Sequence, residues 1–174
     1  MQETSTKPYL LRALHVADRE IERALAHHLP FGARRLLDIG TGTGRLLEVL
    51  APKVEQAVGV DQSREMLALA RANLARAGLD NVEIRQGDMY ALPFEADGFD
   101  VVTIHHVLHY ADDPAAALAE AARVVRPGGT VLVVGHSNTV PALVAALCGC
   151  APDAMDETEY DRMSIVRFAA DGRA

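Results

Sequence analysis

Hydrophobic and polar positions along this chain follow a pattern that predicts strands and helices in turn. Short apolar runs at 35–39, 57–61 and 82–84 are each bounded by polar or small residues, as buried strands are. Between these runs, apolar residues recur every three or four positions, which is the spacing of one helix face. Two more strands are predicted at 99–104 and 130–134, and the second of these is continuously apolar, like a central parallel strand.

Local capping chemistry predicts where the helices begin and end. A short helix is expected at 45–50, directly after a glycine-rich stretch. Ser63 is expected to cap the next helix, because its hydroxyl can accept a free backbone N–H, and Gly78 is expected to end it. Asp113 and Pro114 are expected to open a further helix, since proline loses no hydrogen bond at the first helical position.

The two ends of the chain predict further elements. Leu11, Leu14, Ile21 and Leu25 recur at helical spacing, so the N-terminal stretch is expected to form one amphipathic helix. Beyond Val134 a helix is expected, with Leu143, Val144 and Leu147 on one face, followed by a strand-like run at 165–168.

Alternating strands and helices predict an α/β fold. We expect one Rossmann-like domain, a three-layer α/β/α arrangement with a doubly wound, mostly parallel sheet of about six strands. A length of 174 residues, of which 49% are hydrophobic, agrees with a single globular domain. In such sheets, ligands bind beyond the carboxyl ends of the strands, near the point where the strand order reverses.

Composition narrows the expected partners and location. The formal net charge is −7 and no run of Lys or Arg stands out, which disfavours nucleic-acid binding. Cys148 and Cys150 are too few and too close together for a disulfide framework, which fits a reducing cytoplasm. No signal peptide and no membrane span is indicated, so we expect a cytoplasmic protein, monomeric or homodimeric, without a membrane partner.

The sharpest motif is the loop Asp38-Ile39-Gly40-Thr41-Gly42-Thr43-Gly44, which follows a predicted strand and opens a predicted helix. Glycines there allow a tight turn and the close approach of a ligand. A dinucleotide-binding fingerprint would have its third glycine where Arg45 stands, so a nicotinamide dehydrogenase is a weaker alternative.

Two acidic residues follow the next two strands. Asp61 ends one strand, and its carboxylate can accept hydrogen bonds from both hydroxyls of a ribose. Asp88, in Gly87-Asp88-Met89, or the neighbouring amide can recognise an adenine amino group. Either acid alone is as well explained as a turn or cap residue, but together with the glycine loop they line one edge of the sheet.

These motifs resemble those of class I S-adenosylmethionine-dependent methyltransferases, close to the small-molecule subgroup that includes the ubiquinone and menaquinone enzymes. The resemblance rests on segments 37–44, 58–61, 86–89, 99–102 and 126–129, and it extends over residues 1–134. It implies S-adenosylmethionine or S-adenosylhomocysteine as cofactor, a small-molecule methyl acceptor and no metal. The implied cofactor-binding residues are Asp38, Gly40, Gly42, Gly44, Asp61, Gln62, Asp88, Met89 and His105.

Within that resemblance, the glycines hold the methionine end of the cofactor, Asp61 the ribose and Asp88 the adenine. Asp38 supports the loop or the ammonium group of the ligand. No catalytic general base is implied. His105, His106 and His109 follow the strand at 99–104, and the resemblance favours a loop over the adenine, joined by Tyr110. A metal site is the alternative, because histidines four residues apart share a helix face, but no further ligand cluster completes it.

The sequence after Val134 resembles a different family, the histidine phosphatases of the phosphoglycerate-mutase-like superfamily. By position, His136 in Gly135-His136-Ser137 matches the histidine that stabilises the transferred phosphoryl group there. The chain contains no Arg-His pair, so the phosphate-accepting histidine of that family is missing and covalent phosphoryl transfer has no first step.

We therefore hypothesise an engineered chimera joined near 131–135, in which residues 135–174 complete the same domain. Methyl transfer depends on positioning the acceptor, and the replaced lid and late strands would do that, so turnover stays an open question. The alternatives are a non-catalytic hybrid fold and, last, residual phosphatase activity or phosphate binding.

Overall fold

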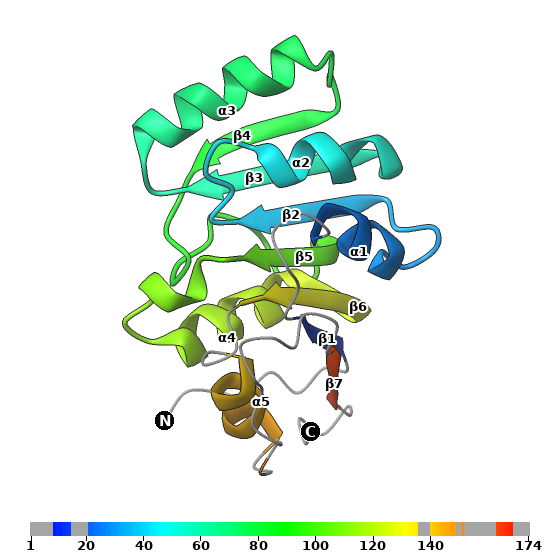
Figure 1. Ribbon diagram of the computed structural model, residues 1–174, viewed down its shortest axis with the longest axis vertical. Helices are drawn as coiled ribbons and strands as arrows, with labels where there is room; N and C mark the ends of the chain where they lie inside the picture. Colours follow the sequence, from blue (N-terminus) through cyan, green and yellow to red (C-terminus); the bar gives the residue numbers. More distant parts are fainter. Residues whose placement is uncertain (1–8, 15–20, 136–139, 149–150, 152–162, 169–174) are drawn as a thin grey trace.

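Seven strands form one sheet in the order β4-β3-β2-β5-β6-β1-β7 in the computed structural model, which describes residues 9–14, 21–135, 140–148, 151 and 163–168 (Figure 1). Every neighbouring pair is parallel except β1 and β7, which are antiparallel. The strands are β1 (Tyr9–Leu14), β2 (Arg35–Ile39), β3 (Gln56–Asp61), β4 (Val82–Gln86), β5 (Phe99–His105), β6 (Val125–Val134) and β7 (Met163–Phe168). The helices are α1 (Ile21–His28), α2 (Arg45–Leu50), α3 (Arg64–Arg76), α4 (Pro114–Val124) and α5 (Val140–Cys148), with short 3₁₀ turns η1 (Ala51–Lys53) and η2 (Leu108–Tyr110).

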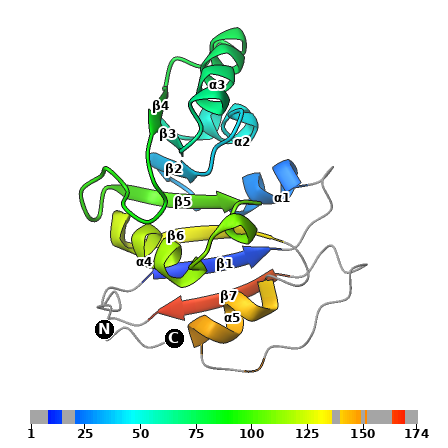
Figure 2. The same ribbon diagram turned by 90° about the vertical axis from the view of Figure 1, so that its left-hand side faces the viewer.

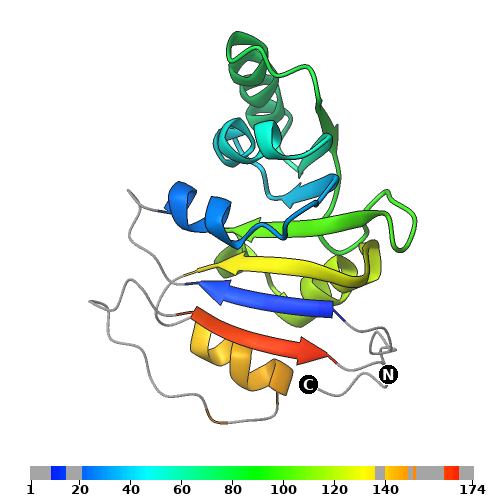
Figure 3. The same cartoon turned by 90° about the vertical axis from the view of Figure 1, so that its right-hand side faces the viewer.

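Helices cover both faces of the sheet, with α1, α2 and α3 on one face and α4 and α5 on the other (Figures 2 and 3). Successive strand residues point to opposite faces, so each inner strand contributes to both hydrophobic cores. Leu36 of β2 packs with Leu47 of α2, whereas Leu37 packs in the core that includes Leu118 of α4. The predicted fold class, a Rossmann-like α/β/α domain, is confirmed.

The strand order reverses between β2 and β5. From β2 the chain proceeds outwards through β3 and β4, and then returns to place β5 on the other side of β2. Because these strands are parallel, their carboxyl ends meet at one edge of the sheet. The glycine loop follows β2 and therefore lies at this switch point, on the edge of the sheet where the sequence predicted ligand binding.

The capping predictions are confirmed by hydrogen bonds. The Ser63 hydroxyl accepts the Met66 N–H at 3.3 Å at the start of α3, and Gly78 follows that helix with a φ of 71°. The Asp113 carboxylate accepts the Ala116 N–H at 3.0 Å, and Pro114 is the first residue of α4.

The prediction of one N-terminal helix is wrong for the first half of that stretch. Residues Tyr9–Leu14 form β1, and only Ile21–His28 are helical. Strand β1 pairs in register with β6 on one side and with β7 on the other. These long-range backbone hydrogen bonds outweigh the local helical spacing of Leu11 and Leu14, which sequence periodicity cannot weigh against them.

The sheet has one strand more than the predicted six, because β1 inserts between β6 and the predicted C-terminal strand β7. The predicted C-terminal helix and strand both form, as α5 and β7. In the described parts of the chain, none of the helices combines the length and the apolar character needed to span a membrane.

Candidate functional site

Three glycines in the left-handed region shape the loop between β2 and α2. The φ angles are 72° at Gly40, 53° at Gly42 and 79° at Gly44, which caps α2. The N–H groups of Gly40 and Thr41 donate to the carbonyl of Val60 at 2.8 and 3.0 Å. The loop is therefore tied to the neighbouring strand β3 by main-chain hydrogen bonds, and its turn requires residues without a Cβ.

Asp61 joins this loop to the start of α3. One carboxylate oxygen accepts the Gly42 N–H at 2.9 Å, and the other accepts the Ser63 N–H at 2.8 Å. The side chain is only partly buried, and each oxygen has a second lone pair. The carboxylate is thus held by the backbone and can still accept hydrogen bonds from a ligand.

Asp88 lies at the centre of a second hydrogen-bonded group. Its Oδ1 accepts the side-chain amide of Gln62 at 3.1 Å and the Tyr90 N–H at 3.0 Å. The Gly87 N–H donates to the Asp61 carbonyl at 3.1 Å, which connects the segment after β4 to the end of β3. These bonds bring the ends of β3 and β4 into one surface.

A cavity of about 330 Å³ opens between these groups at the carboxyl edge of the sheet. Its size lies within the range of small-molecule sites, roughly 300–1,000 Å³. Of the predicted site residues, Gly40, Asp61, Gln62, Asp88 and Met89 line it. The remaining lining residues are Ile39, Val60, Gly87, Tyr90, Val107, Tyr110 and Asp112.

Two glycines in the cavity wall could not be replaced without a clash. A Cβ on Gly40 would lie 2.6–2.9 Å from side-chain atoms of Val107. A Cβ on Gly87 would lie 2.8 Å from the Val60 side chain. At both positions the space that a Cβ would need is already filled by a neighbouring side chain, so glycine is required there by packing.

Asp38 lies beneath the loop rather than in the cavity. The residue is 1% exposed, and burial raises the pKa of its carboxyl to about 6. The Thr103 hydroxyl donates to it at 2.7 Å, which offsets part of that rise in pKa. Asp38 therefore contributes to the site indirectly, because its hydrogen bond with Thr103 links β2 to β5 beneath the loop.

The other predicted residues are placed as follows. Gly42 donates to Asp61 beside the cavity, and Gly44 is buried, where a Cβ would lie 3.2 Å from Ala70 and from Leu74 of α3. His105 is half-buried at the end of β5, with its ring 4.6 Å from that of His106, and does not line the cavity. Within the described residues, no three His, Cys, Asp or Glu side chains are grouped to hold a metal ion.

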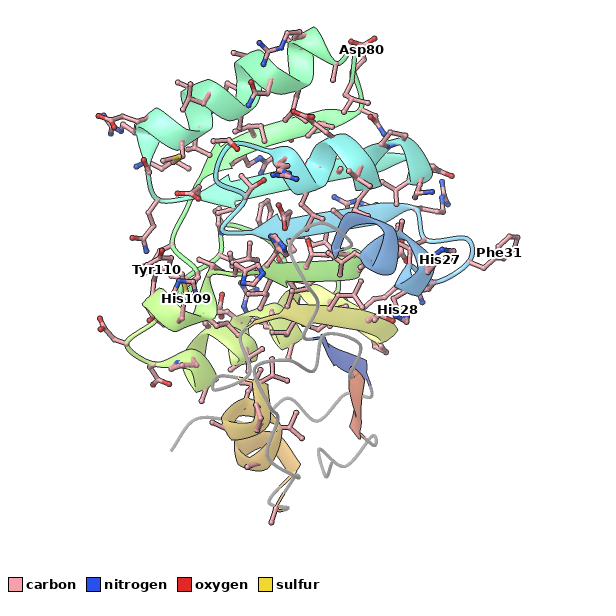
Figure 4. The ribbon with its side chains drawn as sticks, viewed as in Figure 1. His27, His28, Phe31, Asp80, His109 and Tyr110 are labelled. Atoms are coloured by element: carbon pink, nitrogen blue, oxygen red, sulfur yellow. The ribbon has the colours of Figure 1, made fainter. Side chains whose placement is uncertain are left out.

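Sequence reasoning missed part of the cavity wall. Val107 and Asp112, on the segment after β5, line the cavity, and so does Tyr90 after β4. Tyr110, which the family resemblance favours as part of a loop over the adenine, lines the cavity with its ring 3.8 Å from that of His109 (Figure 4). The signal for these residues was only their place just after a strand, which does not say which way a side chain points.

Comparison with known proteins gives a family match and close structural neighbours. The methyltransferase domain family matches residues 37–133, from β2 to β6. An uncharacterized methyltransferase, YcgJ of Bacillus subtilis, is 37% identical over 102 residues, which are 59% of this chain and 40% of that protein. A ubiquinone biosynthesis O-methyltransferase of Methylococcus capsulatus is 33% identical over 140 residues, 80% of this chain and 59% of that protein.

Solved structures agree with the sequence comparison. The crystal structure of YcgJ superimposes with a TM-score of 0.65 at 30% identity, covering 75% of this chain and 58% of that one. A putative methyltransferase of Bacillus halodurans gives a TM-score of 0.63 at 30% identity, and the match covers 75% of this chain and 57% of that one. The chain thus spans about 40–59% of the length of the curated relatives it matches first.

The packing of Gly40 against Val107 predicts a stability difference between two alanine variants. Both Gly40→Ala and Gly42→Ala force alanine into the left-handed region, at about 1–2 kcal/mol each. Only Gly40→Ala also places a Cβ against Val107, whereas nothing lies within 4 Å of a Cβ at Gly42. We expect Gly40→Ala to lose a further 1–3 kcal/mol or so of unfolding free energy. Urea denaturation measures both variants, and equal losses would show that Val107 simply moves aside.

The buried Asp38 predicts a pH dependence of stability. Its folded pKa of about 6 lies above the ordinary value of 3.8, so the folded state keeps this proton longer than the unfolded chain. Stability from this group is therefore lost as pH rises between those values, by roughly 3 kcal/mol at full effect. We expect the free energy of unfolding of Asp38→Asn, measured by urea titration, to rise relative to that of the native protein between pH 4 and pH 7. Asp80→Asn, at an exposed site, is the charge-matched control and should follow the native protein; a gap for Asp38→Asn that does not change with pH would contradict the prediction.

Proposed function

Because this chain belongs to the methyltransferase domain family, we propose that its cavity binds S-adenosylmethionine and that the protein transfers the methyl group to a small-molecule acceptor. One observation carries the proposal. The glycine loop, Asp61 and Asp88 follow three different strands, and a single cavity of about 330 Å³ joins Gly40, Asp61 and Asp88. Each group has the chemistry that one part of this cofactor needs.

The residues present fit the cofactor on structural grounds. Gly40 and Gly87 line the cavity, and neither position has room for a Cβ. The lining side chains that carry a charge are the carboxylates of Asp61, Asp88 and Asp112, and no Lys or Arg is among the described lining residues. Such a wall favours a cationic ligand over an anionic one.

We assign roles residue by residue. Gly40 and Gly42 approach the methionine end, and Gly44 is needed for the packing of α2 on α3. Asp61, already oriented by the Gly42 and Ser63 amides, accepts the ribose hydroxyls. Asp88 and the Met89 amide face the adenine, and Gln62 holds Asp88 in place. We assign His105 no contact with the cofactor, because Val107 and Tyr110 line the cavity and His105 does not.

Bound S-adenosylmethionine would supply a methyl group on a sulfonium that is already a good leaving group. The protein's part is then to hold the methyl donor and the acceptor in line and to keep water away. The exposed Tyr110, at the cavity mouth, lies where an acceptor would enter. Among the curated relatives, a ubiquinone biosynthesis O-methyltransferase acts on a small molecule, which supports a small-molecule acceptor here.

We also propose that the tail belongs to the same domain. Strand β7 pairs with β1 along its whole length, and α5 shares a hydrophobic core with α4. The resemblance of the tail to histidine phosphatases and the chimeric origin both stay predictions. His136, their key residue, lies outside the described residues.

The ribose assignment predicts the effect of Asp61→Ala on binding. Hydrogen bonds to a charged group contribute about 1.5–3 kcal/mol each, so their loss should weaken S-adenosylhomocysteine binding by at least about tenfold. Asp61→Asn keeps an oxygen that can accept from the hydroxyls, so its affinity should lie between those of the native protein and Asp61→Ala. Calorimetric titration measures all three proteins.

Asp80→Ala is the matched control. It also removes a carboxylate, but Asp80 precedes β4 and so lies at the amino ends of the strands, away from the cavity at their carboxyl ends (Figure 4). It should bind like the native protein. If the native protein does not bind S-adenosylhomocysteine at all, the proposed function is wrong. If it binds, and folded Asp61→Ala titrates with the same affinity, only the ribose assignment is wrong.

A further inference from the structure

One wall of the cavity is a short segment that is attached at both ends. Residues 107–112, after β5, contribute Val107, Tyr110 and Asp112 to the lining. At one end, Val107 packs directly on the backbone of Gly40. Within the segment, the Tyr110 N–H donates to the Val107 carbonyl and the Ala111 N–H donates to the Leu108 carbonyl, and the Leu108 side chain is buried in the core.

The far end of this segment is held by Tyr90. The Asp113 N–H, directly after the segment, donates to the Tyr90 hydroxyl at 3.2 Å. Asp113 also caps α4 with its side chain, so this bond fixes the point where the segment joins the helix. Tyr90 is half-buried and packs against the core beneath α4.

Tyr90 is also bonded to the opposite wall. Its own N–H donates to Asp88 Oδ1 at 3.0 Å, the same oxygen that accepts the Gln62 amide. Two residues further on, the Leu92 N–H donates to Glu120 of α4 at 2.9 Å, and the Arg123 guanidinium donates to the Leu92 carbonyl at 3.0 Å. The backbone around Tyr90 is therefore firmly placed, and its hydroxyl is a fixed acceptor at the end of the segment that joins α4.

We propose that Tyr90 is a positioning residue for the cofactor, whose hydroxyl fastens the 107–112 segment over the cavity. This inference rests on the proposed function. The hydroxyl does not touch the cofactor in this account; it acts by holding the wall that carries Tyr110 and Asp112. Removal of the hydroxyl frees the end of the segment that carries Asp112, while Val107 and the buried Leu108 still hold the other end, so bound ligand escapes sooner.

The test compares two tyrosines of the same cavity. Tyr90→Phe removes the acceptor of the Asp113 N–H, and Tyr110→Phe removes a hydroxyl from a residue that is 77% exposed. Dissociation of S-adenosylhomocysteine is followed by stopped-flow displacement, and hydrogen exchange is measured at the Asp113 amide. We expect about fivefold faster dissociation for Tyr90→Phe, the ordinary contribution of one neutral hydrogen bond, with faster exchange at Asp113. Tyr110→Phe should leave the exchange of that amide unchanged.

A general loss of structure is separated from this result by thermal unfolding, in which both variants should melt close to the native protein. If Tyr90→Phe releases S-adenosylhomocysteine at the native rate, or if Asp113 exchanges no faster in this variant, the positioning role is overturned. If the native protein does not bind S-adenosylhomocysteine, the proposed function fails and this inference with it. Native binding that Tyr90→Phe leaves unchanged overturns this inference alone.

Discussion

The end of β3 holds the glycine loop in place, and the cavity depends on that attachment. The Val60 carbonyl accepts two loop amides, and the Asp61 carboxylate accepts a third. A loop with glycines in the left-handed region has few side chains of its own to pack, so these acceptors decide its path. The same carboxylate also begins α3 through Ser63. One side chain thus fixes the positions of two helices and still presents lone pairs to a ligand.

Much of this arrangement could be predicted from the sequence, because its causes are local. The caps at Ser63 and Asp113 depend on hydrogen bonds within one helical turn, and both formed as expected. The meeting of Gly40, Asp61 and Asp88 follows from one rule, that parallel strands end at the same edge. Neither prediction required knowledge of a distant contact.

The remaining features depend on contacts that a local pattern does not contain. Strand β1 is a strand because β6 and β7 offer backbone partners on both sides, and helical spacing at Leu11 and Leu14 gave the opposite prediction. His105 was expected in the site, but Val107 lines the cavity in its place. The cavity lining after β5 begins at Val107, beyond His106, whose φ is 49°.

The position of β1 between β6 and β7 has a consequence for how the chain folds. On the ribosome β1 is made before either partner, and it has to wait until nearly the whole central sheet has been synthesised. Strands β2 to β5 can associate in the meantime, since their connections are short and each new strand joins one already present. The candidate cavity would therefore form early, β1 would join once β6 is made, and β7 would be the last of the seven described strands to pair. Until β7 pairs, β1 presents an open edge, so this step is the one at which a crowded cell could divert the protein towards aggregation.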